Sequence, residues 1–236
     1  MPPTYTELAN QITAQYQSNP MIRVVNFHNT PRTNEAQIER QLTQYSKDFT
    51  SVNETELRDY MRTGQWTKSK PGMLPVVYEG YRNGFDVMAP LLEQYNFVGW
   101  YFIITEFIKC TIAEQLPYAL SHHIAMQTRE YPDGRYALSW DEIRKLSQKH
   151  VIASHARNHS ELSKLTAEVR EREVMGAQED FKANLGRPVL AFASLRGPAH
   201  LEHPDVDTSK LVEAAGYEFV FSNYQIQRIK NGGKHA

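Results

Sequence analysis

Short apolar runs alternate with helix-like segments along almost the whole of this 236-residue chain. The apolar runs have strand length and end at turn residues, whereas the segments between them repeat their apolar residues with helical spacing. Such alternation is typical of an α/β domain with a mostly parallel sheet, and the number of units favours closure towards a barrel. The sequence contains no internal repeat and no low-complexity linker, so we expect one domain over residues 1–236.

The predicted elements follow this alternation along the chain. We expect strands at residues 22–27, 49–52, 75–78, 98–104, 151–153, 189–192 and 219–222. We expect helices at residues 35–45, 56–61, 86–95, 140–148, 164–185 and 208–215, with Asn53 and Ser139 as N-caps of two of them. Residues 1–20 are expected to form a helical lead-in, and residues 105–138 an insertion with a turn near its end.

The composition excludes several classes of protein. With 41% apolar and 22% charged residues the chain can bury a full core, and its net charge of −1 gives no basic surplus for binding nucleic acid. The single cysteine, Cys110, excludes an internal disulfide framework and a cysteine-rich zinc site. No run approaches the roughly 18 apolar residues of a membrane span. The N-terminus lacks signal-peptide features, so we expect a cytoplasmic protein, or a secreted one if a leader was removed.

A pair of histidines in the segment HVIASHARNHSEL is the strongest chemical signal. The four-residue spacing of His155 and His159 predicts two imidazoles on one face of a helical turn, directly after an apolar strand. Neutral imidazole is a good ligand for a divalent ion, although a solvated helix face gives the same spacing. His28, Glu79 and Ser194 follow other predicted strands, and the carboxyl ends of parallel strands in a barrel meet at one mouth.

Three segments of the chain together resemble the polysaccharide deacetylases, the NodB-like proteins of carbohydrate esterase family 4. They are VNFHNT at 25–30, LPVVYEGYRNGFDVMAPLLEQYNFVGWYFI at 74–103 and SWDEIRKLSQKHVIASHARNHSELSKL at 139–165. The resemblance implies a distorted (β/α) barrel with fewer than eight units that removes acetyl groups from a glycan. It also implies a divalent ion, most commonly zinc, held by one aspartate and two histidines, with a second aspartate as general base and a later histidine as general acid.

Residue by residue, the resemblance assigns a metal site with one altered ligand and an altered base. His155 and His159 match the two histidine ligands, and Glu79 occupies the place of the metal-binding aspartate. Tyr78 stands where the base aspartate is expected, and a phenol with a pKa of about 10 is a poor base at neutral pH. Glu79 would act as base itself if it left the metal. We expect Glu79 and Tyr78 to contribute to catalysis.

The remaining predicted site residues serve proton transfer and substrate binding. No late leucine–histidine motif for the family's general acid is visible, so His28 at the predicted mouth is our candidate acid. Tyr81, which follows the altered motif, and Arg196, which follows the sixth predicted strand, are candidates for binding substrate.

These observations favour an enzyme, a metal-dependent hydrolase acting on carbon–nitrogen bonds other than peptide bonds. Its expected substrate is an acetylated sugar or a related small amide. The alternative is a catalytically degenerate protein of the same fold that binds a glycan or a protein partner without turnover. Tyr78 and Glu79 favour this alternative, whereas the intact pair of His155 and His159 favours the hydrolase. A homo-oligomer is left open, with the lead-in helix and the insertion as candidate contact surfaces.

Overall fold

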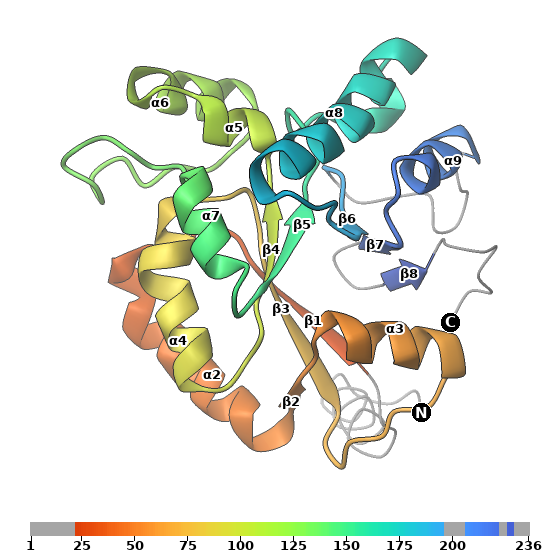
Figure 1. Ribbon diagram of the computed structural model, residues 1–236. Helices are drawn as coiled ribbons and strands as arrows, with labels where there is room; N and C mark the ends of the chain where they lie inside the picture. The colour runs from red at the N-terminus through yellow and green to blue at the C-terminus, as the bar shows by residue number, and fades with distance from the viewer. Residues whose placement is uncertain (1–21, 196–205, 222–225, 229–236) are drawn as a thin grey trace, which may run out of the picture.

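The computed structural model describes residues 22–195, 206–221 and 226–228 (Figure 1). The predicted lead-in helix and Arg196 lie outside these residues. One sheet contains all the strands of the described part: β1 (Ile22–Phe27), β2 (Thr50–Ser51), β3 (Gly72–Val77), β4 (Trp100–Ile103), β5 (Val151–Ser154), β6 (Ala191–Phe192), β7 (Phe219–Phe221) and β8 (Ile226–Arg228).

The strand order confirms the predicted fold class. The sheet runs β1-β3-β4-β5-β6-β7 with every neighbouring pair parallel, β2 pairs with the start of β3, and β8 is antiparallel to β7. Six parallel strands therefore form a half-barrel with helices packed around it (Figure 1). β3 is buried along its whole length, as expected for a strand covered on both faces.

Helices connect the strands at nearly all the predicted positions. They are α2 (Glu35–Asp48), α3 (Glu54–Thr63), α4 (Ala89–Gln94), α5 (Thr105–Lys109), α6 (Ile112–Ser121), α7 (Trp140–Leu146), α8 (Ala167–Leu185) and α9 (Val206–Ala214), with short turns at Arg32–Asn34 and Leu162–Lys164. Asn53 and Ser139 cap α3 and α7 as predicted, each in a reciprocal capping box with a glutamate. None of the described helices is both long and apolar enough to cross a bilayer.

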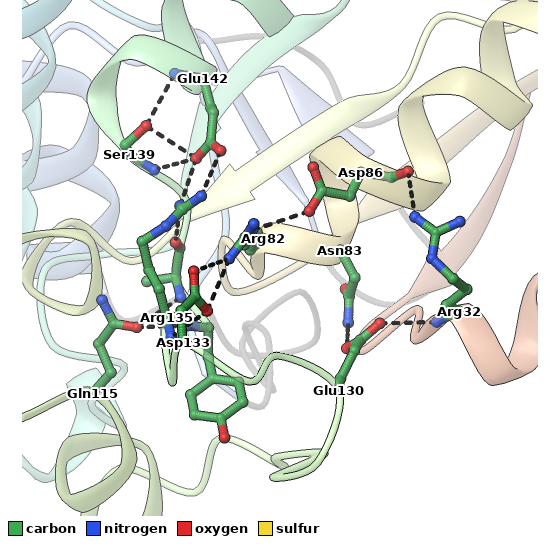
Figure 2. Close-up of polar contacts among 12 residues, drawn as sticks. Arg32, Arg82, Asn83, Asp86, Gln115, Glu130, Asp133, Arg135, Ser139 and Glu142 are labelled. Atoms are coloured by element: carbon green, nitrogen blue, oxygen red, sulfur yellow. Dashed lines mark hydrogen bonds and ion pairs between the residues drawn. The ribbon is translucent and has the colours of Figure 1, made fainter. Parts of the chain in front are cut away.

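The single helix predicted at residues 86–95 is instead divided into two parts. A π-helical turn, Gly84–Met88, precedes α4, and the Ala89 amide donates back to the Gly84 carbonyl. Pro90 explains the break, because it has no N–H to donate to the Asp86 carbonyl. Arg32 donates to this carbonyl at 3.4 Å instead (Figure 2).

The two faces of the sheet carry separate apolar clusters. One face packs against α2, α4, α7 and α8, and its core includes Leu42, Leu92 and Phe181. The other face carries Trp100 and Phe102 under α3, and Tyr78 lies in this second cluster. Because side chains alternate along a strand, every second residue of β3 points into each cluster. Tyr78 is thus packed into the core directly beside the end of β3.

Polar contacts anchor the loop between α6 and α7 to the rest of the fold (Figure 2). Glu130 accepts from the Arg32 amide and from Asn83, both at 2.8 Å. Asp133 forms an ion pair with Arg82 at 2.8 Å. Through these contacts the predicted insertion lies against the loops that follow β1 and β3.

Candidate metal centre

A strained turn places Glu79 at the end of β3. Its φ is +68°, and the Gly80 amide donates to the Tyr78 carbonyl at 2.9 Å, which closes a γ-turn around Glu79. Gly80 has φ of +91°, and a Cβ there would lie 3.0 Å from Ile108. A non-glycine residue with positive φ is uncommon and is kept where the surroundings over-determine it, often at functional sites. The turn therefore fixes the direction of the Glu79 side chain.

The two oxygens of the Glu79 carboxylate have different surroundings. The residue is 4% exposed, and Oε1 accepts a hydrogen bond from Nδ1 of His28 at 2.8 Å. Oε2 is buried and has no hydrogen-bond partner among the described residues. A buried carboxylate oxygen without a partner is costly, and a cation at this oxygen removes that cost.

His155 is held by the sheet with one ring nitrogen free for a ligand. Its amide continues the pairing of β5 by donating to the Ile103 carbonyl at 2.9 Å. Its Nδ1 lies 3.0 Å from the Ala193 carbonyl, which only accepts, so Nδ1 carries the proton and Nε2 keeps its lone pair. Burial, with the neighbouring His159 charge, lowers the pKa of His155 to about 3. The imidazole is therefore neutral near pH 7.

His159 lies close to His155, but the predicted helical turn between them is wrong. Residues 155–159 form an irregular loop in which Ala156 and His159 have φ of +60° and +59°, a conformation that no α-helix contains. Its Nδ1 donates to the carbonyl of His122 at 2.7 Å, so here too Nε2 keeps the lone pair. Burial lowers the pKa of His159 and favours the neutral ring.

The three predicted ligands come together in the structure. One ligand atom from each of Glu79, His155 and His159 lies within 4.8 Å of the others, and all three residues are buried. A carboxylate oxygen with two neutral imidazoles is a donor set that zinc and similar ions use. The orphaned carboxylate oxygen and the two oriented imidazoles therefore fit a divalent ion.

Tyr78 forms a wall of this centre. It is 3% exposed, and its ring lies 5.0 Å from the ring of His28 and 5.0 Å from that of His155. Burial, and then the charge of Glu79, raises the pKa of the Tyr78 phenol above its usual value. The phenol is therefore protonated at neutral pH, and its predicted catalytic contribution stays a prediction.

His28, unlike Tyr78, is largely exposed to solvent. Its side chain is 58% exposed, and its ring stacks on Tyr78. The hydrogen bond that His28 donates to Glu79 raises the pKa of His28, and partial burial opposes this. A histidine whose pKa is raised carries a proton more readily near neutral pH, which suits the predicted acid.

The two predicted substrate-binding residues remain untested. Tyr81 is 3% exposed, its hydroxyl donates to the Ala125 carbonyl at 2.7 Å, and its ring packs against Phe107. This packing does not favour contact with a ligand. Arg196 lies outside the described residues.

Sequence reasoning missed the groups that orient the two imidazoles. They are the carbonyls of Ala193 and His122, and a backbone carbonyl leaves no signal in residue types. His122 stacks its ring on Tyr118 at 3.9 Å, and its carbonyl accepts from Nδ1 of His159.

Comparison with known proteins places this half-barrel, with a carboxylate and two histidines at its mouth, among the NodB-like deacetylases. The sequence profile of the polysaccharide deacetylase family matches residues 77–220, more than half of the chain. The chain belongs to the polysaccharide deacetylase family. No curated protein sequence matches it.

Solved structures of deacetylases share the fold at low sequence identity. The Streptococcus pyogenes deacetylase PplD, in complex with acetate, has a TM-score of 0.65 at 14% identity over 91% of this chain and 88% of its own. IcaB from Ammonifex degensii has a TM-score of 0.62 at 16% identity over 91% of each chain. A de-N-acetylase from Aggregatibacter actinomycetemcomitans has a TM-score of 0.65 at 11% identity, covering 89% of this chain and 92% of its own.

Membership of the family supports a polysaccharide deacetylase function and implies an acetylated sugar as substrate. Deacetylases of this family are generally metal-dependent, which agrees with the cluster of Glu79, His155 and His159.

Proposed function

We propose that this protein is a divalent-metal-dependent hydrolase that removes the acetyl group from an N-acetylated sugar. Glu79, His155 and His159 hold the ion, and zinc suits this donor set. The observation that carries the proposal is the buried Glu79 Oε2, which has no hydrogen-bond partner among the described residues and lies beside two imidazoles whose Nε2 lone pairs are free.

The residues around the centre orient its ligands and limit access of water. A divalent ion bound there supplies Lewis-acid activation of water and polarisation of the acetyl carbonyl. The carbonyls of Ala193 and His122 hold the two imidazoles in the ligating tautomer. Tyr78 covers the apolar side of the centre with its ring and keeps that side dry.

His28 supplies the proton that the leaving nitrogen needs. Cleavage of an amide releases an amine, which leaves easily only when it is protonated. In its protonated form His28 donates from Nδ1 to Glu79 and still carries a proton on Nε2. The exposed position of His28 gives a large substrate access to that proton.

Among the described residues, the centre has no dedicated general base. The Tyr78 phenol is buried and protonated, and within the described residues no second carboxylate joins the cluster. Base assistance typically contributes about 10²–10⁴-fold to the rate, so we expect a slow enzyme.

Release of acetate from N-acetylglucosamine oligomers tests this function. We expect zinc-loaded protein to release acetate steadily, and a chelator or His155→Ala to abolish the release. Failure of the loaded protein to release acetate from such oligomers, peptidoglycan fragments or small acetamides would overturn the proposed activity.

The buried Tyr78 in the base position favours one alternative, a degenerate deacetylase that binds a glycan or a protein partner without turnover. Equilibrium binding of the same oligomers discriminates the two. Saturable binding with no acetate release supports the alternative, whereas release that follows metal loading supports the enzyme.

A further inference from the structure

The loop that carries His159 needs support from outside itself. The sheet fixes His155 through its amide, whereas His159 lies four residues further on in an irregular segment. Ala156 and His159 both have positive φ, and each such residue costs free energy that other contacts must offset.

A buried carboxylate on α8 supplies these contacts. Glu173 is 3% exposed, and its Oε2 accepts from the backbone amides of Arg157 at 3.2 Å and Asn158 at 2.8 Å. Its Oε1 accepts from the Asn158 side chain at 2.7 Å. The two residues that Glu173 holds are therefore the pair between Ala156 and His159.

The carboxylate and the loop depend on each other. Within the described part of the chain, no lysine or arginine forms an ion pair with Glu173, and its carboxylate accepts from amide groups of the loop. A buried carboxylate needs such donors, because otherwise it loses its hydration without compensation. The loop in turn gains a fixed anchor immediately before His159.

The opposite side of the loop is clamped as well. The Arg157 carbonyl accepts from the Glu106 amide at 3.0 Å, and its guanidinium donates to the Glu106 carboxylate at 2.7 Å. On α8, a Cβ at Gly176 would lie 2.8 Å from the Arg157 guanidinium, so glycine at this position lets the Arg157 side chain pack closely on the helix. Residues 157 and 158 thus lie between α5 and α8, with Glu173 as the central acceptor.

We propose that Glu173 is a positioning residue that sets the geometry of the metal centre by holding the 155–159 loop. The inference rests on the proposed metal site, and it adds a residue that touches neither the ion nor the substrate. Without this acceptor, residues 157 and 158 lose their anchor and His159 loses its fixed place relative to His155 and Glu79.

Metal binding by Glu173→Gln tests the inference. The substitution keeps the size of the side chain but places an NH₂ group opposite amide donors. Groups that hold a metal ligand in place typically contribute 10–100-fold to affinity, so we expect the zinc Kd to rise roughly 10–100-fold. We also expect the visible absorption spectrum of the cobalt-loaded variant to change, because that spectrum reports the arrangement of the ligands.

Two further variants keep the test decisive. Glu171→Gln makes the same chemical change at an exposed position of α8 and should bind zinc like the wild type. Asn158→Ala removes the 2.7 Å bond to Glu173 Oε1 together with the longer bond, 3.4 Å, that Asn158 Oδ1 accepts from the Tyr118 hydroxyl, and we expect a rise in Kd of roughly threefold to tenfold. If Glu173→Gln does not fold, Asn158→Ala decides the question.

The outcomes separate this inference from the proposed function. A Glu173→Gln variant with wild-type zinc affinity and an unchanged cobalt spectrum overturns the positioning role, even if its melting temperature falls. Wild-type protein that binds neither zinc nor cobalt overturns the metal site itself, and the inference falls with it.

Discussion

The two halves of the candidate metal centre differ in how many of the residues implied by the family resemblance they retain. The half on residues 155–159 keeps both histidines, each oriented by a backbone carbonyl, on a loop braced by Glu173. The half at the end of β3 has Tyr78 and Glu79 where two aspartates are expected. Metal binding and base catalysis are therefore separable in this chain: the structure supports the first and weakens the second.

Removal of the Glu79 charge should abolish tight metal binding, and this is the largest effect that we expect. In Glu79→Gln the carboxylate ligand is lost, and we expect the zinc Kd to rise more than about 100-fold, beyond the effect of groups that only hold ligands. The metal-free variant should be at least as stable as the wild type, because Oε2 has no partner to lose among the described residues. Isothermal titration measures the zinc Kd, and thermal unfolding measures the stability of the metal-free variant. A large loss of stability in the metal-free protein would contradict this account of Glu79.

Loss of the His28 proton separates acid catalysis from metal binding. Asn in place of His28 retains an N–H to donate to Glu79 but does not titrate. We expect kcat for acetate release to fall about 100-fold in His28→Asn, with less than a threefold change in zinc Kd.

The dependence of kcat on pH tests whether His28 acts as an acid. An acid acts only when protonated, so wild-type kcat should fall as pH rises through the pKa of His28, which Glu79 raises. His28→Asn should lack this alkaline limb. An unchanged kcat in the variant would exclude His28 as the acid.

Substitutions at Tyr78 test whether the residue in the position of the family's general base contributes to catalysis. The Tyr78 phenol is protonated, so Tyr78→Phe should change kcat by less than about threefold. Tyr78→Asp restores a carboxylate, and we expect kcat to rise about tenfold while stability falls by about 3 kcal/mol through loss of a buried ring. A severe loss of activity in Tyr78→Phe would show that the phenol itself takes part in catalysis.

The smallest expected effect concerns stability away from the centre. His150 is buried, its Nδ1 accepts from the Gly99 amide at 3.1 Å, and burial lowers its pKa despite the nearby Glu93. Lys149 also lowers the pKa of His150. The folded protein therefore holds His150 neutral while the unfolded chain takes up a proton below about pH 6.5.

This contribution to stability is complete above pH 6.5 and is lost as pH falls towards the lowered pKa of His150. Asn in its place offers Oδ1 to Gly99 without titrating. Between pH 6.5 and 5, we expect the stability of metal-free His150→Asn to fall less steeply, by up to about 1.4 kcal/mol per pH unit. Urea unfolding at several pH values measures the difference. Parallel slopes for the two proteins would contradict the assignment.

The sequence was sufficient for the fold class and for bringing the three candidate ligands together, whereas their binding of a metal stays a prediction. Alternating strand and helix periods predicted the parallel half-barrel, and strand ends predicted that Glu79 and His155 meet. Local spacing failed for His159, because tertiary contacts of residues 157 and 158 override the helical geometry that four-residue spacing suggests. Pro90 similarly shortened a predicted helix by removing one backbone donor.

Other features were beyond sequence reasoning for physical reasons. The backbone carbonyls that orient the histidines leave no signal in residue types, and residue type alone does not distinguish Glu173 from the other charged residues of the helix predicted at 164–185. Glu173 is buried because the 155–159 loop packs against α8, a tertiary contact that the sequence pattern does not predict.

Metal content of the purified protein tests the central claim most directly. Protein prepared without chelator and supplemented with zinc is measured by elemental analysis beside His155→Ala, with His150→Asn as the matched histidine control. We predict about one equivalent of ion in the wild type and in His150→Asn, and none in His155→Ala. No bound ion in the wild type, or equal amounts in His155→Ala, would contradict a metal centre at Glu79, His155 and His159.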